Sequence, residues 1–357
     1  MKLLRLIYLV FVILFCASCI MEETDLGQAN EDVSYPGYFI LSTTDYQTKV
    51  SYSADGVSSY FQEGEKVGVF ALDADKKPVS GKKENACYIV NIDEKIDLRT
   101  NQNLRTLNYN TAEDDLGGGA EYYLFYYPYR SDMTFAQVRN LTHSVAENQN
   151  IRGAFQASDL LWDIASPVSN AEGYEGEYVW VHMDHAMAHI IIELDDEKIS
   201  EGVNPLLRDV RKTASNLNLL MDGTDKINYQ PEGDVGDIES WHVGYSKSGA
   251  KMFRVAVPAF QSLEKDKTLV SFTMVDSLGI TREKNCELTQ TLDLRPGKTY
   301  YFRLTEKFID PVKLTDDDSW VLDVIHPRTG ELVGLLCREY PSFQPGRDTM
   351  TDYDIIT

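Results

Sequence analysis

The stretch that decides the fold is Tyr122-Tyr123-Leu124-Phe125-Tyr126-Tyr127, six aromatic and aliphatic residues without a polar break. Aromatic residues favour β-strands, and six residues is an ordinary strand length. In a strand, Tyr123, Phe125 and Tyr127 share one face and the other three residues share the opposite face. The stretch indicates either a strand buried on both faces or a platform whose exposed Tyr123 and Tyr127 rings contact a glycan or a protein.

Similar β-rich segments recur along the chain, separated by clusters of Gly, Asn, Asp and Pro that are typical of turns. They are residues 67–72, 88–92, 190–194, 253–257, 269–274 and 300–304. Helical periodicity is scarce, and we expect short helices only at residues 134–140 and 205–212. This pattern predicts an all-β sandwich and disfavours an enzyme fold of alternating strands and helices.

The size and charge of the chain set further limits. Its 357 residues suit two domains, and a cluster of Pro and Gly at residues 166–176 predicts the boundary between them. We therefore expect one β-sandwich domain at residues 35–170 and a second at 171–308. With 34 Lys and Arg against 56 Asp and Glu, the net charge is −22, which argues against binding to nucleic acid.

The first 18 residues have the form of a secretory signal peptide. Lys2 and Arg5 precede an apolar run at residues 6–15, which is too short to cross a bilayer as a mature helix. The sequence Cys16-Ala17-Ser18-Cys19 resembles the lipobox of bacterial lipoproteins. The resemblance implies cleavage between Ser18 and Cys19, and acylation of Cys19 that anchors the chain in membrane lipid. Removal of the peptide changes the net charge to −24.

An acidic segment follows the acylation site. Residues 19–34 contain few apolar side chains and are expected to form a flexible tether. Glu22, Glu23 and Asp25 resemble the signal that exports lipoproteins to the cell surface in certain anaerobic Gram-negative bacteria. This resemblance implies a surface-exposed protein anchored in the outer membrane.

The sequence offers no convincing metal or catalytic site. Cys87, Cys286 and Cys337 remain in the mature chain, enough for one disulfide, and there is no Cys-x-x-Cys pair for structural zinc. Three His residues and an Asp occur at residues 182–189, but alternation in a strand separates them onto two faces. We predict structural or incidental His residues, no bound metal, no cofactor and no catalytic residue.

The order of several short motifs resembles the fimbrillin (Mfa-like) family of lipoproteins that build type V pili. After the lipobox, the motifs are Gly64-Glu65-Lys66-Val67-Gly68-Val69-Phe70, Tyr126-Tyr127-Pro128-Tyr129, Ser158-Asp159-Leu160-Leu161-Trp162, His185-Ala186-Met187-Ala188-His189-Ile190, Pro258, and Leu294-Arg295-Pro296-Gly297-Lys298-Thr299-Tyr300. The resemblance covers roughly residues 35 to 306.

The resemblance implies two tandem transthyretin-like Greek-key β-sandwich domains and a non-enzymatic role as a pilus anchor, minor or tip component. It also implies partners, namely other fimbrial subunits joined by exchange of β-strands after proteolytic removal of an N-terminal strand. Polymerising members are cleaved after an early Arg, but no Arg occurs here between Cys19 and Arg99. Lys49 and Lys66 are therefore the candidate maturation sites.

Further expectations concern the C-terminal extension, two possible glycosylation sites and an alternative function. Residues 309–357 form an extension in which segments 320–325 and 332–338 are predicted to pair as a hairpin. Ser277 and Thr349 lie in Asp-Ser/Thr-apolar triplets that resemble bacterial O-glycosylation acceptors. The alternative function is a surface lipoprotein that is not incorporated into pili and binds a glycan through its aromatic residues. A host protein or glycan is a further candidate partner under either function.

Overall fold

The computed structural model describes residues 39–41, 51–52, 59–97, 102–169, 177–194, 204–246, 249–275, 281–288, 291–306, 320–323 and 338–340. These residues are predominantly β-strands, which confirms the all-β prediction. The helices are short: the 3₁₀ turn η1 (Ala112–Asp114), α2 (Phe135–Val138) and α3 (Arg152–Ser158). No helix among the described residues is long and apolar enough to span a bilayer.

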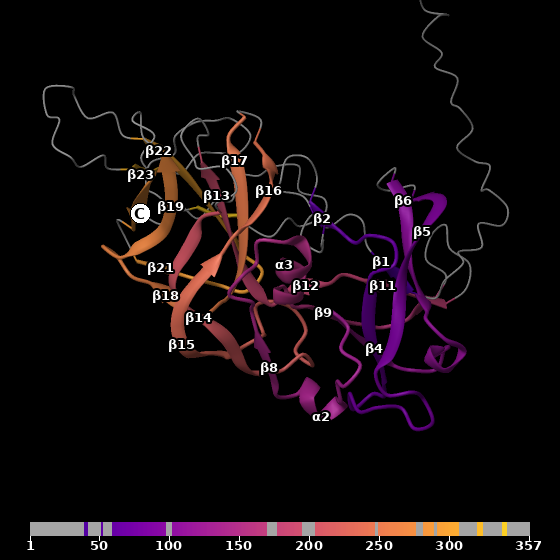
Figure 1. Cartoon of the computed structure of the whole chain (residues 1–357). Helices are drawn as coiled ribbons and strands as arrows, with labels where there is room; N and C mark the ends of the chain where they lie inside the picture. The colour runs from indigo at the N-terminus through magenta and orange to yellow at the C-terminus, as the bar shows by residue number, and fades with distance from the viewer. Residues whose placement is uncertain are drawn as a thin grey trace, which may run out of the picture.

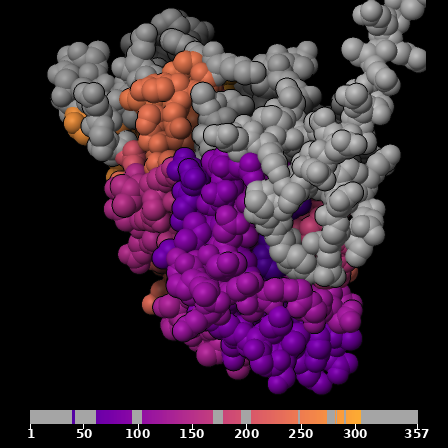
Figure 2. Space-filling view, turned by 90° about the vertical axis from the view of Figure 1, so that its right-hand side faces the viewer, coloured from indigo at the N-terminus to yellow at the C-terminus, as the bar shows by residue number. Residues whose placement is uncertain are grey.

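The N-terminal half forms a curled nine-stranded sheet. Its strands, in spatial order, are β10 (Val168–Ser169), β11 (Glu177–Val181), β1 (Phe39–Leu41), β6 (Gln102–Tyr109), β5 (Ala86–Asp97), β4 (Lys66–Leu72), β7 (Tyr122–Tyr127), β9 (Leu161–Ala165) and β12 (Asp184–His185). Figure 1 shows most of these strands in indigo and purple, on one side of the molecule, and Figure 2 shows that their residues form most of the adjoining face.

The C-terminal half is built on two further sheets, of six and five strands. One consists of β16 (Trp241–Tyr245), β17 (Lys251–Pro258), β13 (Met187–Leu194), β22 (Thr299–Glu306), β23 (Trp320–Asp323) and β24 (Arg338–Tyr340). The other consists of β15 (Gln230–Glu239), β14 (Leu206–Leu217), β19 (Thr268–Val275), β20 (Thr281–Glu287) and β8 (Leu141–Ser144). Two small ladders pair β18 (Ser262–Leu263) with β21 (Leu292–Asp293) and β2 (Ser51–Tyr52) with β3 (Ser59–Tyr60).

Strand β7 is buried on both faces and separates two apolar cores. Tyr123, Phe125 and Tyr127 belong to the core enclosed by the nine-stranded sheet. Leu124 and Tyr126 belong to the larger core, which continues between the two C-terminal sheets. The two-sided interpretation of the aromatic stretch is confirmed, and the strand holds the centre of the molecule together by contributing to both cores.

The segment between β7 and β9 links the two halves. Strand β8 pairs with β14 of the C-terminal half, and α3 contacts β17. In Figure 1, α3, β9 and β12 lie between the purple and orange parts of the molecule. The domain boundary at residues 166–176 stays a prediction, and residues 141–158 lie on the C-terminal side of this arrangement although they precede it in sequence.

One of the two predicted helices is confirmed and the other is wrong. The predicted helix at 134–140 is present as α2, whose N-cap residue Thr134 accepts a hydrogen bond from the Gln137 N–H. Residues 205–212 lie almost wholly in strand β14 instead. Two register irregularities in the pairing of β14 with β15 break the strict alternation of buried residues, so Leu207, Val210 and Ala214 are buried at a helix-like spacing.

The predicted hairpin of segments 320–325 and 332–338 stays a prediction, because residues 324–337 lie outside the described ranges. Strands β23 and β24 each pair with the same strand, β22, rather than with each other. They lie along one edge of β22, and β13 pairs with the opposite edge of the same strand. Pairing with β22 explains how two short strands, which are marginal in isolation, are stabilised.

Candidate functional site

Two places in the fold are candidates for function: the strand β1 in the N-terminal sheet, and a buried polar cluster between the two halves. Strand β1 is only three residues long, yet it lies inside the sheet and pairs on one side with β6 and on the other with β11. The pairing is antiparallel with β6 and parallel with β11. Every residue of β1 is buried.

The side chain of Phe39 is the main anchor of β1. Its ring makes edge-to-face contacts with Tyr88, Tyr123 and Phe125, at centroid distances of 4.9, 4.8 and 5.0 Å. Leu41 joins the same core, whereas Ile40 packs on the opposite face of the sheet. Apolar residues at the alternate positions 39 and 41 on one face and at position 40 on the other, with main-chain pairing on both sides, are the arrangement by which one strand completes a sheet.

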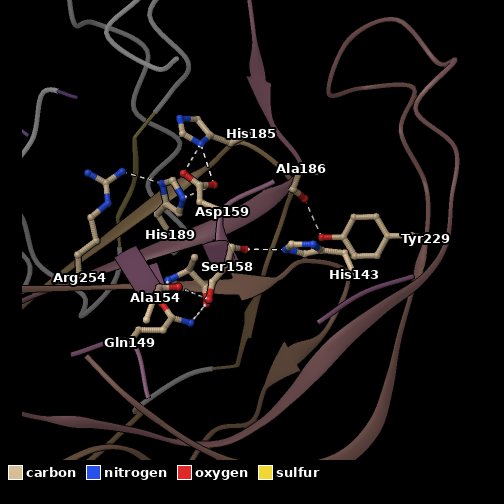
Figure 3. A network of polar contacts seen from close by, with 11 residues as sticks. His143, Gln149, Ala154, Ser158, Asp159, His185, Ala186, His189, Tyr229 and Arg254 are labelled. Carbon is tan, nitrogen blue, oxygen red and sulfur yellow. Dashed lines mark hydrogen bonds and ion pairs between the residues drawn. The ribbon is translucent and has the colours of Figure 1, made fainter. Parts of the chain in front are cut away.

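The second candidate is a cluster of Asp159, His185 and His189 that converge from different elements. Asp159 follows α3, His185 lies in β12 and His189 lies in β13. All three side chains are at most 4% exposed, and Figure 3 shows them pointing toward one another. His185 Nδ1 lies 2.9 Å from the Asp159 carboxylate, and His189 Nε2 also lies 2.9 Å from it.

Arg254 of β17 completes the cluster. Its Nη2 group donates to His189 Nδ1 over 2.6 Å, which assigns the remaining ring proton of His189 to Nε2, on the side of Asp159. Arg254 is 3% exposed, so a buried guanidinium and a buried carboxylate are joined through an imidazole. This arrangement gives each buried charge a partner, which buried charges require.

The cluster also shifts the pKa values of its members. Burial lowers the pKa of His189 to about 3, and the nearby charges of Arg254 and His185 add to this effect against the opposing charge of Asp159. Burial opposes ionisation of Asp159, but the adjacent imidazoles of His185 and His189 hold its pKa well below the usual range. Asp159 is therefore ionised and His189 neutral in the folded chain at neutral pH.

The same three residues form a set that matches metal-binding side chains. Their ligand atoms lie within 4.8 Å of one another. However, both nitrogens of His189 are engaged, one with Arg254 and the other facing Asp159, and a guanidinium beside the cluster repels a cation. The geometry supports a structural role, in which the cluster ties α3 to β12, β13 and β17.

Alternation along a strand places His185 and His189 on one face but gives no indication of their partner, Asp159. Asp159 is 26 residues from His185 in sequence, and nothing local in the sequence brings them together. His182, which was expected on the other face, is exposed, and its backbone N–H donates to the Asp163 carboxylate over 2.7 Å. The sequence feature that could have identified Asp159 is its position in the Ser158–Trp162 motif, directly after α3.

The motifs that carry the family resemblance contact one another in the fold. Gly68 pairs directly with Tyr126 across β4 and β7. Asp159 contacts the two histidines of the His185–His189 motif. The Gly297 N–H donates to the carbonyl of Met187, over 3.0 Å, and so joins the last motif to that same segment. The motifs therefore mark structural contacts between strands rather than catalytic groups.

The predicted aromatic platform is wrong. Tyr123 is fully buried and Tyr127 is 6% exposed, because both side chains pack into the core of the nine-stranded sheet. Tyr123 Oη donates to the carbonyl of Gly117, and the ring of Tyr127 packs edge-to-face on Phe61. Neither ring is available to a partner in this fold.

The other predicted sites are distributed as follows. Lys66 is exposed and begins β4, between β5 and β7 in the sheet. Cys87 and Cys286 are buried free thiols. The remaining predicted residues lie outside the described ranges: Ser18, Cys19, Glu22, Glu23, Asp25, Lys49, Ser277, Cys337 and Thr349.

Comparison with known proteins gives structural neighbours only. No protein-family model and no curated protein matches the sequence. A Bacteroides ovatus structure assigned to cell adhesion is 12% identical and has a TM-score of 0.44, with 75% of this chain and 90% of that chain covered. The tip fimbrial protein Mfa3 of Porphyromonas gingivalis is 9% identical with a TM-score of 0.38, covering 80% and 98%. The fimbrial anchor protein Mfa2 of the same organism is 12% identical with a TM-score of 0.31, covering 80% and 93%.

These neighbours are β-rich adhesion and fimbrial proteins.

Proposed function

We propose that this chain is a non-enzymatic cell-surface lipoprotein that serves as an anchor, minor or tip subunit of a type V pilus. The observation that carries the proposal is that the motifs of the fimbrillin resemblance are in mutual contact, as at Gly68 with Tyr126 and Asp159 with His185. Acylation of Cys19 in the lipobox would anchor the chain in the membrane, and a pilus would display it at the cell surface.

Assembly is proposed to use the position of β1. If Phe39–Leu41 left the sheet, the facing edges of β6 and β11 would lose their partner and the pocket of the Phe39 ring would open to solvent. A partner strand that offers apolar residues at alternating positions would restore both the main-chain pairing and the core contacts. The chain would thereby join the next subunit of the pilus.

A reversible lock tests this role of β1. Ile40 and Thr106 are directly paired across β1 and β6, so the double variant Ile40→Cys/Thr106→Cys places two thiols at facing positions. We expect the oxidised variant to reach the cell surface but to be absent from pilus polymers, and reduction to restore its incorporation. Equal incorporation of the oxidised and reduced forms would contradict strand exchange at β1.

A matched control separates this effect from the mere presence of a disulfide. Thr213 and Glu232 face each other across β14 and β15, in the C-terminal half. The variant Thr213→Cys/Glu232→Cys carries a cross-link of the same kind that leaves β1 free. It is expected to polymerise like the wild-type chain whether oxidised or reduced.

Maturation by a Lys-directed protease is part of the proposal, at Lys49 or Lys66. The Lys66 peptide lies within the nine-stranded sheet, where its carbonyl accepts from the Tyr129 N–H, so cleavage there requires β4 to open. This constraint favours Lys49 of the two. N-terminal analysis of the surface form tests the assignment, since an intact acylated Cys19 indicates an anchor and a new terminus after Lys49 indicates a polymerising subunit.

A further inference from the structure

An exposed aromatic side chain occupies a strained position in the C-terminal half. Phe260, between β17 and β18, has φ of 59° and is 41% exposed. A bulky residue rarely adopts this left-handed conformation, which is strained and persists only where the surroundings enforce it. Such strain marks a position where the placement of a side chain matters.

Hydrogen bonds on both sides enforce this conformation. The Phe260 N–H donates to the carbonyl of Leu294 over 2.8 Å, and the preceding Ala259 N–H donates to Tyr229 Oη over 2.6 Å. The side chain of Gln261 donates to the carbonyl of Pro258 over 2.6 Å. Tyr229 also packs edge-to-face on the Phe260 ring, at a centroid distance of 4.9 Å. The exposed ring is therefore held in one orientation before any partner binds.

Two hollows lie on either side of this ring. One has a volume of about 460 Å³ and extends toward β14, and the other has a volume of about 590 Å³ and extends toward the turn before β22. Phe260, Gln261 and Ser262 line both. The volumes fall within the range of small-ligand sites, about 300–1,000 Å³. A ligand lying across the Phe260 ring would reach into both hollows.

The residues that line the hollows include a higher proportion of basic side chains than the chain as a whole. Their charged residues are five cations and four carboxylates, against 34 and 56 in the whole chain. Arg211 lines one hollow and Arg295 lines the other, and both are exposed. Among the described residues, the neighbouring Arg208 pairs with Asp237 and Glu283, whereas neither Arg211 nor Arg295 forms an ion pair. Arg211 Nη1 donates to the carbonyl of Gly233 over 2.8 Å, which leaves the positive charge of Arg211 without a carboxylate and its other nitrogens able to bind an anion.

We propose that this surface binds a short oligosaccharide that carries a carboxylate, such as a uronic acid. The Phe260 ring stacks on the C–H face of one sugar, because the negative face of an aromatic ring attracts polarised C–H groups. Arg211 or Arg295 holds the carboxylate of a neighbouring sugar, whose two oxygens match the guanidinium fork. A densely sulfated polymer is disfavoured, because the net charge of −22 repels it.

This inference goes beyond the role in a pilus, and it needs no strand exchange. A chain that binds the sugar but never enters a pilus would support the binding surface and refute the proposed function. A chain that enters pili but binds no sugar would support the proposed function and refute the binding surface.

Calorimetric titration of the acylated full-length chain in detergent micelles tests the proposal. The probe is a tetrasaccharide of alternating glucuronic acid and N-acetylglucosamine. We expect saturable binding, and weakening of at least about tenfold in the Phe260→Asn, Arg211→Gln and Arg295→Gln variants. The variant Phe260→Tyr keeps a ring and is expected to bind like the wild type.

Asn is chosen at position 260 because it tolerates the left-handed conformation, so this variant is expected to fold and to be no less stable. The matched control is Tyr109→Asn, which removes another half-exposed ring, at the end of β6. It should leave the affinity unchanged.

Two further ligands complete the test. The methyl ester of the same tetrasaccharide and a heparin tetrasaccharide should both bind more weakly than the carboxylate. Unchanged binding by folded Phe260→Asn, equal binding of the methyl ester, preference for heparin, or no binding by the wild type would each overturn the proposal.

Discussion

The ring of Tyr126 lies over Gly68 of the neighbouring strand, in the space that a side chain at position 68 would occupy. A Cβ atom built on Gly68 would lie far inside contact distance of Tyr126 Cε1. The ring is fully buried, and its hydroxyl donates to Asn85 Oδ1 over 2.6 Å. Because Gly68 of β4 has no side chain, the ring of Tyr126 on the neighbouring strand β7 can pack against its backbone.

Replacement of Gly68 by Ala should therefore destabilise the protein. The added methyl group has to displace a buried ring that is fixed by its hydrogen bond, and overpacking of this kind costs about 1–3 kcal/mol. Urea unfolding followed by circular dichroism measures the loss. The control is Gly153→Ala in α3, where a Cβ meets nothing within 4 Å, and this change should leave stability unchanged or increase it. Equal stability of the two variants would contradict the packing described here.

Strand positions could be predicted well from the sequence, because β-branched and aromatic residues cluster where both faces are buried. The stretch at 122–127 coincides with β7, and its burial on two faces follows from its unbroken apolar character. Strand β14 was mistaken in part for a helix, since its bulges produce the spacing of buried residues that a helix has. Pairing of β23 and β24 with β22 depends on tertiary contacts that no local pattern contains.

The buried cluster around Asp159 should be essential for stability. The variant Asp159→Asn keeps the shape of the side chain but removes the buried negative charge with which His185 and His189 pair. Breaking one partner of such a pair typically costs about 3–5 kcal/mol, and the same urea titration measures it. The control Asp75→Asn removes one partner of an exposed ion pair with Lys77 and should change stability by less than about 1 kcal/mol. A small effect of Asp159→Asn would show that the cluster is not the link between α3 and the sheets.

Stability should depend on the ionisation of Asp163 in β9. Burial raises its pKa to about 7, and the charges of Asp184 and Asp222 add to this effect. The folded chain therefore retains a proton that the unfolded chain has lost above about pH 4, so this group's contribution to stability falls as the pH rises from about 4 to 7. The variant Asp163→Asn should be more stable than the wild type at pH 8, with the difference shrinking toward pH 4. Thermal unfolding at both pH values measures the effect, and a pH-independent difference would contradict the raised pKa.

The buried thiols should be unreactive while the chain is folded. Burial raises the pKa of Cys286 to about 12 and also raises that of Cys87, so little thiolate is present at pH 8. In a Cys337→Ser variant of the acylated chain, we expect a thiol reagent such as DTNB to label neither residue until denaturant is added, and then to label both. Rapid labelling of the native protein would show that one of these strands opens readily.

The functional residues were harder to predict than the strands, for a physical reason. Asp159, His185 and Arg254 lie on three separate elements, and only the folded arrangement of sheets brings them together. Phe260 had no signal in the sequence, because a single aromatic residue beside a turn is common and its left-handed conformation is imposed by the Leu294 carbonyl and Tyr229. By contrast, the Cys19 lipobox rests on a local motif that needs no tertiary context to be recognised.

This chain is proposed to be a subunit of a surface pilus. The most direct measurement is quantitative mass spectrometry of filaments sheared from cells that express the wild-type chain, compared with the oxidised Ile40→Cys/Thr106→Cys variant. We predict that the wild-type chain co-purifies with the filaments in a fixed ratio to the other subunits, and that the locked variant stays in the membrane fraction. Filaments that lack the wild-type chain, while it remains monomeric at the cell surface, would contradict the account.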